Sequence, residues 1–194
     1  MPTMDFFGQT YEVDDSYILV ATRAVKAGRP NLNFDMFEAD ELKRAASTYD
    51  DCDQVFVEHT YVKTTDLASN YEDGIDRSRT RGFVVAEHYV DEDQTLHLLI
   101  AIDKRYRQLC NSIMDGSIGS VSMGCQCDLY CSICGTEFDD THSCECGACP
   151  NFIGTVNVDG DLVYDILRNV EFYEISCILT QPAEDSALFY EVVE

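Results

Sequence analysis

Alternation of apolar and polar residues is the strongest pattern in this chain, and it is clearest from Val121 to Leu129. Apolar or sulfur-bearing side chains occupy every second position there, as expected of a strand with one face against a core. These positions are Val121, Met123, Cys125, Cys127 and Leu129. Ser122 and Gly124 have the opposite parity, so we expect them to face a cleft or solvent, with Gly124 leaving room for another backbone to approach.

Similar apolar, β-branched runs predict further strands along the chain. They span residues 17–22, 54–60, 83–90, 95–102, 152–158 and 170–180. Helical spacing predicts one helix over about 33–46 and another over about 103–114, with Gly116 at its C-terminal cap. Residues 162–167 fit either a short helix or a strand, and residues 64–80 lack periodicity and predict a long loop.

These elements favour a mainly β or α+β fold, an antiparallel β-barrel or sheet with helical cover. The 194 residues fit a single domain, with the cysteine-rich residues 130–150 as an insertion within it. Residues 1–14 are polar and acidic without periodicity, so we expect an irregular, flexible N-terminus. No apolar run approaches the length of a membrane span, and the first residues do not resemble a secretory signal.

The net charge of the chain excludes some classes of binding partner. Lys and Arg total 13 against 36 Asp and Glu, which gives a formal net charge of -23. Such a chain repels phosphate backbones and anionic membrane surfaces, so we expect it to bind neither nucleic acid nor membrane. The charge would attract a basic protein partner, and it would also keep the chain soluble in a crowded compartment.

The ten cysteines are clustered, with seven of them between Cys125 and Cys149. Clustering without a secretory signal favours metal binding in a reducing cytoplasm over a disulfide scaffold. The spacing that best matches a zinc site is a pair of C-x2-C motifs, formed by Cys131, Cys134, Cys146 and Cys149. Cys144 could replace either of the last two, and His142 is a weaker candidate. Four thiolates leave no open position, so this Zn²⁺ would be structural.

Ser122 is the candidate nucleophile, and such chemistry also needs an imidazole and a group that orients it. The chain has four histidines, His59, His88, His97 and His142. His59 ends an apolar strand beside Glu58, while His88 and His97 lie on a predicted hairpin. A single serine or histidine on a strand is more often structural, so the pattern alone does not establish catalysis.

Six segments, taken in order, carry a resemblance to a known family. They are Gly28–Asn33, Val55–His59, Leu98–Asp103, Ile113–Gly124, Cys131–Gly135 and Glu174–Ala183. In this order and spacing they resemble the prohead (capsid maturation) serine proteases of large tailed bacteriophages, which are distant relatives of the herpesvirus assembly proteases. The resemblance covers about residues 17–187 and implies a β-barrel of the herpesvirus-protease type with an inserted zinc knuckle.

The resemblance also implies roles for individual residues. Ser122 matches the nucleophile, His59 the general base, and Glu174 the acidic residue that orients the histidine. Glu58 and Asp66 are poorer alternatives for that last role. Acyl transfer also needs a group that stabilises the oxyanion, and our own hypothesis, which is separate from the resemblance, is a backbone N–H near Gly124 or the side chain of Arg168.

The implied activity is that of a serine endopeptidase that cleaves scaffold or core proteins, the capsid protein and itself. The implied place is the assembling prohead in the host cytoplasm, where the protease would be a homo-oligomer. Two other readings compete with this one. The first is a catalytically silent zinc-binding scaffold or core component of the same shell. The second is a zinc-ribbon adaptor, for which the charge argues against a nucleic-acid partner.

Overall fold

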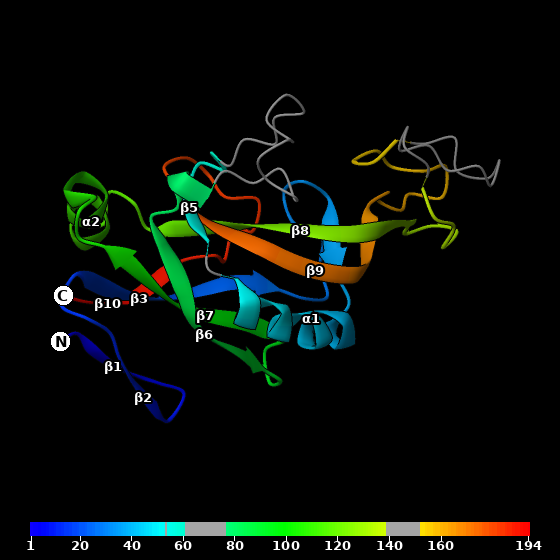
Figure 1. Ribbon diagram of the computed structural model, residues 1–194. Coiled ribbons are helices and arrows are strands. Elements are labelled where there is room, and N and C mark those ends of the chain that lie inside the picture. The colour runs from blue at the N-terminus through cyan, green and yellow to red at the C-terminus, as the bar shows by residue number, and fades with distance from the viewer. Residues whose placement is uncertain (53, 61–76, 139–151) are drawn as a thin grey trace, which may run out of the picture.

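The computed structural model describes residues 1–52, 54–60, 77–138 and 152–194 (Figure 1). The fold is mainly β, with a curled, half-barrel sheet and a separate two-stranded hairpin. The elements, in chain order, are β1 (Thr3–Phe6), β2 (Gln9–Glu12), β3 (Tyr17–Lys26), β4 (Asp35–Phe37), α1 (Ala39–Ala46), the 3-10 helix η1 (Ser47–Asp51), β5 (Val55–Val57), the 3-10 helix η2 (Arg77–Arg79), β6 (Gly82–Val90), β7 (Thr95–Asp103), α2 (Arg107–Met114), β8 (Ser120–Cys131), β9 (Asp165–Ile178) and β10 (Phe189–Val193).

The large sheet has the strand order β10-β3-β7-β6-β5-β9, and both β4 and β8 also pair with β9. The predicted antiparallel barrel is wrong in one respect, because β4 and β5 pair with β9 in parallel. The chain between β5 and β9 includes β6, β7, α2 and β8, which supplies the long crossover that parallel pairing needs. One isolated bridge, Ser120 to Leu188, joins β8 to the residue before β10 and brings the two margins of the sheet together at that point.

The long ribbon of β8 and β9 places the candidate residues (Figure 1). Ser122 lies opposite Ser176 in this pair, and Gly124 lies opposite Glu174. The predicted apolar face of β8 is confirmed. Val121 is buried in the main core, and the other members of the set pack against that core, namely Met123, Cys125, Cys127 and Leu129.

The other edge of β9 is covered by α1 and η1 where neither β4 nor β5 reaches it. Glu41 accepts a hydrogen bond from the Val170 N–H at 2.7 Å, and the Thr48 hydroxyl accepts one from the Phe172 N–H at 2.9 Å. Side chains thus replace a neighbouring strand over this stretch of β9, and its backbone donors stay satisfied.

Most predicted elements are present, with shifted ends. The second predicted helix corresponds to α2, and Gly116 follows it with a φ of 77°, as a C-terminal glycine should. The first helix begins only at Ala39, because residues 35–37 pair with β9 as a strand. Residues 152–158 do not form the predicted strand and contribute only an isolated bridge between Val156 and Leu162.

The N-terminus differs from the expectation. Residues 3–12 form a hairpin of β1 and β2 instead of an irregular segment. Met4 and Phe6 are buried against Leu19 and Leu99 on the outer face of the large sheet. Strands of four residues leave too short a pattern to detect, and docking onto a finished sheet supplies the stability that an isolated hairpin lacks. No helix within the described ranges is long and apolar enough to cross a membrane.

Candidate active site

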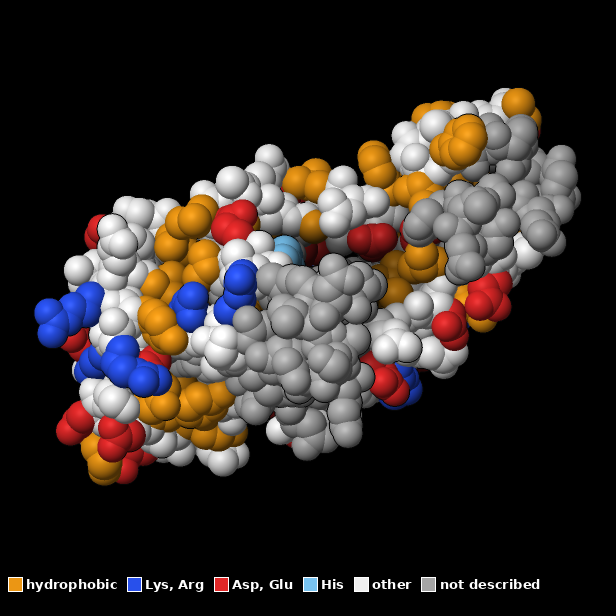
Figure 2. All heavy atoms as spheres, turned by 45° about the horizontal axis from the view of Figure 1, so that its top comes forward, with side chains coloured by type: hydrophobic (Ala, Val, Ile, Leu, Met, Phe, Trp, Pro, Cys, Tyr) orange, Lys and Arg blue, Asp and Glu red, His pale blue; other side chains and the backbone are white. Residues whose placement is uncertain are grey.

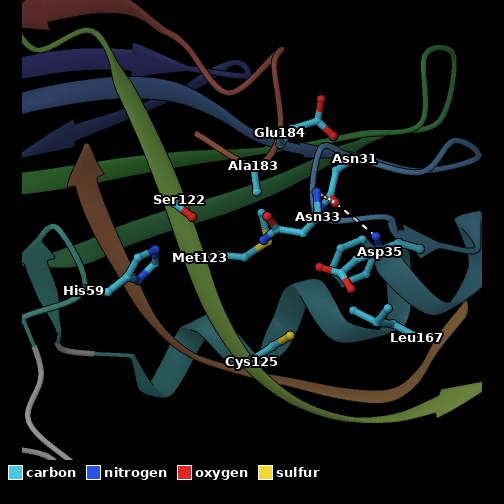
Figure 3. Close-up of a pocket in the computed structure, with 11 residues that line it drawn as sticks. Asn31, Asn33, Asp35, His59, Ser122, Met123, Cys125, Leu167, Ala183 and Glu184 are labelled. Carbon is cyan, nitrogen blue, oxygen red and sulfur yellow. Dashed lines mark hydrogen bonds between the residues drawn. The ribbon is translucent and has the colours of Figure 1, made fainter. Parts of the chain in front are cut away.

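A cavity of about 310 Å³ lies beside β8, and both Ser122 and His59 line it (Figure 3). Its opposite wall comes from β4, from the loop before β4 and from the segment before β10. The lining residues are Asn31, Asn33, Asp35, Phe37, His59, Ser122, Met123, Cys125, Leu167, Ala183 and Glu184. The structure therefore places the two main candidates, which are distant in the sequence, in the wall of one cavity.

Ser122 lies near the beginning of β8 and is partly exposed to the cavity. Its hydroxyl makes no hydrogen bond to any described residue, the imidazole of His59 included. In structures without substrate, the bond between nucleophile and base is often long or poorly aligned. The arrangement brings the hydroxyl to the cavity and leaves it available to a bound molecule.

His59 belongs to a tight turn that follows β5. Glu58 and His59 have φ values of 53° and 49°, which are uncommon for residues other than glycine. Hydrogen bonds from β9 and from the residues after it hold this turn at both Glu58 and His59. The Glu58 carboxylate accepts the N–H groups of Leu179 and Thr180, and the His59 N–H donates to the Ser176 hydroxyl at 3.2 Å. These bonds fix the direction in which the imidazole points.

Glu174 lies at the centre of this arrangement and is completely buried. Its Oε1 is 2.8 Å from Nδ1 of His59, and its Oε2 accepts the Ser176 hydroxyl at 2.7 Å. Ser176 in turn accepts the His59 N–H, so three residues form a closed ring of hydrogen bonds. Both oxygens of the buried carboxylate are satisfied, as burial of a charge requires.

The hydrogen bond to Glu174 raises the pKa of His59 above its ordinary value of 6.5, although partial burial of the ring acts in the opposite direction. When the imidazole is neutral, its proton stays on Nδ1 beside the carboxylate. The lone pair is then on Nε2, the nitrogen that would accept a proton from a nucleophile. Figure 3 shows the ring close beside β8, near Ser122.

Gly124 has a different role from the one expected. A Cβ at this position would lie 2.5 Å from Oε1 of Glu174 and 2.9 Å from Cζ of Tyr173. The space beside Gly124 is therefore occupied by the Glu174 carboxyl group and does not receive a second backbone. Glycine is required here because it lets the buried carboxylate fit against β8.

The alternative residues do not join the set. Glu58 bonds to the backbone of residues 179 and 180 instead of the imidazole. Arg168 lies far along β9, opposite Asp128, where it forms an ion pair with Glu38 at 3.3 Å. The expected contribution of Arg168 to an oxyanion site is thus wrong, because the side chain does not line the cavity. Asp66 lies outside the described residues.

His88 and His97 have a packing role at the N-terminal hairpin. The ring of Phe7, between β1 and β2, stacks on His88 with centroids 4.0 Å apart and meets His97 edge-on at 5.0 Å. Burial lowers the pKa of His97. Packing of the two rings against aromatic neighbours is a structural role for these strand histidines.

Cys125 also lines the cavity, so it is a rival nucleophile. A hydrogen bond with Cys127, together with burial, raises the pKa of the Cys125 thiol. A protonated thiol is a poor nucleophile, because the reactive form is the thiolate. This favours Ser122 over Cys125 as the group that reacts.

Two of the five predicted zinc ligands, Cys131 and Cys134, belong to the described residues. Cys131 is buried, its sulfur accepts the Ile133 N–H at 3.4 Å, and Gly135 closes the turn with a φ of 68°. The two cysteines lie on one tight turn, as the C-x2-C spacing of a zinc site requires. This half of the motif therefore fits a zinc ion. Cys144, Cys146 and Cys149, like His142, lie outside the described residues.

Ser176 is the member of the hydrogen-bonded ring that sequence reasoning did not assign. The signal was present in the Glu-x-Ser spacing, since residues two apart on a strand share a face. The spacing alone therefore places the carboxylate of Glu174 and the hydroxyl of Ser176 side by side.

Comparison of the chain with protein-family models, with curated proteins and with solved structures found no match. The geometry of Ser122, His59, Glu174 and Ser176 therefore carries the functional argument.

Proposed function

We propose that this protein is a serine endopeptidase in which Ser122 is the nucleophile, His59 the general base and Glu174 the residue that orients His59. The observation that carries the proposal is the 2.8 Å contact between His59 Nδ1 and a completely buried Glu174, beside a cavity that Ser122 also lines. Acyl-transfer catalysis uses a hydroxyl, an imidazole that takes its proton and a carboxylate that orients the imidazole, and here the first two line one cavity while the third contacts the imidazole.

The reaction would proceed in two steps. Nε2 of His59 takes the Ser122 proton while Oγ forms a bond to the peptide carbonyl carbon. The C–N bond then breaks, the amine leaves with the proton from His59, and an acyl-enzyme remains. Water, deprotonated by His59, releases the acyl group and restores Ser122. The base should contribute about 100- to 10,000-fold to the rate.

The proposed setting is the assembling prohead of a tailed bacteriophage, in the host cytoplasm. There the enzyme would act as a homo-oligomer on scaffold or core proteins, on the capsid protein and on itself. The half-barrel sheet and the order of the six segments support this proposal, which includes a herpesvirus-protease type of barrel. A Zn²⁺ held by four of the five clustered cysteines, with Cys131 and Cys134 as the first pair, would stabilise the end of β8 as a structural ion.

A phosphonofluoridate probe, which reacts only with an activated serine, tests the proposal directly. The unmodified chain should be labelled at Ser122, as located by mass spectrometry of the digested protein. Ser122→Ala should abolish both labelling and self-cleavage, while its circular dichroism and zinc content stay unchanged. Ser120→Ala is the matched control on the same strand and should be labelled normally. Equal self-cleavage by Ser122→Ala would refute the proposal.

The competing proposal is a catalytically silent zinc-binding scaffold or core component. It is favoured by one observation, the lack of any hydrogen bond between the Ser122 hydroxyl and described residues. Under this proposal the probe leaves Ser122 unmodified even when the folded chain is labelled at high probe concentration for many hours.

A further inference from the structure

An open groove of about 800 Å³ borders the same turn that carries His59. Val57 and Thr60, on either side of Glu58 and His59, line it together with Leu179 at the end of β9. The remaining lining comes from the segment before β8, from α2 and from the residues that lead into α2 and β6. The groove therefore adjoins the proposed active site but is distinct from the cavity that holds Ser122.

The charge of this groove is opposite to that of the chain. Its described lining includes three arginines, Arg81, Arg105 and Arg107, and no Asp or Glu. In the whole chain, acidic residues outnumber basic ones by 36 to 13. Basic side chains in Figure 2 lie beside exposed hydrophobic ones on this face. A cluster of one sign in a chain of the other sign points to a ligand.

Two of these arginines have no carboxylate partner within the described part of the chain. Arg105 is paired with Asp103, with 2.7 Å between Nε and the carboxylate. Arg81 instead rests on the ring of Tyr106, 4.3 Å from its centroid, and neither Arg81 nor Arg107 forms an ion pair with a described residue. Stacking on Tyr106 holds the Arg81 guanidinium in place, and Nη1 donates to the Thr80 carbonyl oxygen at 3.3 Å, so its remaining N–H groups can bind a ligand.

The groove also has an apolar part. Val57, Leu109, Ile118 and Leu179 lie in its lining, and Leu179 is 59% exposed. An exposed leucine in an apolar hollow, with guanidinium groups around it, suits a ligand that has both an aliphatic side chain and anionic groups.

We propose that the groove binds an acidic segment of the polypeptide substrate, in which an aliphatic side chain enters the hollow and neighbouring carboxylates pair with Arg81 and Arg107. The identification of the ligand as substrate rests on the proposed function, because the groove adjoins the His59 turn. Planar guanidinium groups bind carboxylates through two parallel hydrogen bonds. An acidic segment would otherwise be repelled by a chain of charge -23, so a local basic site is needed to hold it.

The cavity beside Ser122 differs in charge from the groove. Asp35 and Glu184 line it, and its described lining contains no Lys or Arg, although Glu184 is paired with Arg29 at 2.9 Å. The two hollows on the His59 turn therefore select for different parts of one extended chain, and the acidic part belongs in the groove.

Fluorescence anisotropy with the full-length Ser122→Ala chain tests binding without cleavage. The probe is a fluorescein-labelled peptide with one leucine between glutamates, and its control carries glutamine in place of each glutamate. We expect the glutamate peptide to bind about tenfold or more tightly than the glutamine peptide, with the difference shrinking between about 50 and about 300 mM NaCl. Equal binding of the two peptides would overturn the proposal.

Arginine variants locate the site. Arg107→Gln, an exposed position, should weaken binding about tenfold, and Arg81→Gln with Arg107→Gln should weaken it further. The double variant Arg23→Gln, Lys26→Gln removes two positive charges from β3, away from the groove, and should bind normally. Unchanged binding by Arg107→Gln, or an oligonucleotide of equal charge that binds more tightly than the peptide, would refute an acidic-peptide site.

The two proposals fail separately in these experiments. If the probe labels Ser122 but the glutamate peptide does not bind, the groove proposal is wrong and the peptidase stands. If the peptide binds through Arg107 but Ser122 is never labelled, the groove is an acidic-peptide site and its ligand is not a substrate.

Discussion

The two proposed sites lie at the two ends of β8 and are built in different ways. At the first end, Ser122 lies near a carboxylate, a hydroxyl and an imidazole that come from β9 and from the turn after β5. At the second end, Cys131 and Cys134 lie within one turn of the chain. The first site depends on pairing between strands that are distant in the sequence. The described half of the second depends only on cysteines that are close in the sequence. A single substitution near Ser122 should therefore have a larger effect on its site than a single substitution near Cys131 and Cys134 has on theirs.

The largest effect should come from Glu174→Gln. The amide keeps the shape but loses the charge that holds the proton on Nδ1 of His59, so kcat/KM should fall about 100- to 10,000-fold. Glu171→Gln, an exposed position on the same strand, is the matched control and should leave the rate unchanged. If kcat/KM of Glu174→Gln falls by less than about threefold, the carboxylate does not orient the base.

The pH dependence of the same pair of proteins adds a second measurement. The base must be neutral, so kcat/KM of the unmodified chain should rise with pH, with a midpoint above 6.5 because Glu174 raises the pKa of His59. In Glu174→Gln the largest effect that raises the pKa of His59 is lost, while burial still lowers this pKa and only the weaker attraction of Glu58 still raises it, so the midpoint should move to lower pH. A midpoint that stays in place would assign the titration to another group.

The next effect concerns the cysteine end of β8. Zinc at about 100 times its Kd stabilises a folded chain by about 2.7 kcal/mol. Cys131→Ser, or removal of the metal by a chelator, should therefore lower Tm by about 5–10 °C. Activity should fall with it, because β8 connects the knuckle to Ser122.

Cys52→Ser is the control for that experiment, since it alters a buried cysteine outside the cluster. It should keep the zinc content measured by atomic absorption, even if packing costs some stability. If chelation strips the metal and changes neither Tm nor activity, the two ends of β8 are independent.

The smallest effect should come from Gly124→Ala. The added methyl would meet Glu174 Oε1 at 2.5 Å, and overpacking of this kind costs about 1–3 kcal/mol. Gly119→Ala is the matched control, because a Cβ there meets its nearest neighbour, the Gly116 carbonyl oxygen, at 3.9 Å. Urea denaturation should separate the two variants. Equal stability would show that Glu174 moves aside without cost.

The sequence was sufficient for local features and insufficient for the pairing of distant strands. Period-2 alternation identified the buried face of β8, and helical spacing with Gly116 identified α2. The parallel pairing of β5 with β9, which brings the His59 turn to Ser176, leaves no local pattern. Such register depends on the whole sheet. For the same reason, the place of Ser122, His59 and Glu174 in one set came from resemblance to a family and not from periodicity.

The way in which β9 is enclosed has a consequence for control of the protein. Strands β4, β5 and β8, with Glu41 and Thr48, occupy hydrogen-bonding positions along both sides of β9. Amide hydrogens in such a strand exchange with solvent only when a large part of the sheet opens. Glu174 is thus part of the least exchangeable region of the sheet, whereas His59 sits on a short turn beyond the end of β5. The His59 turn is therefore a part of the hydrogen-bonded set that can move while the sheet around Glu174 stays closed.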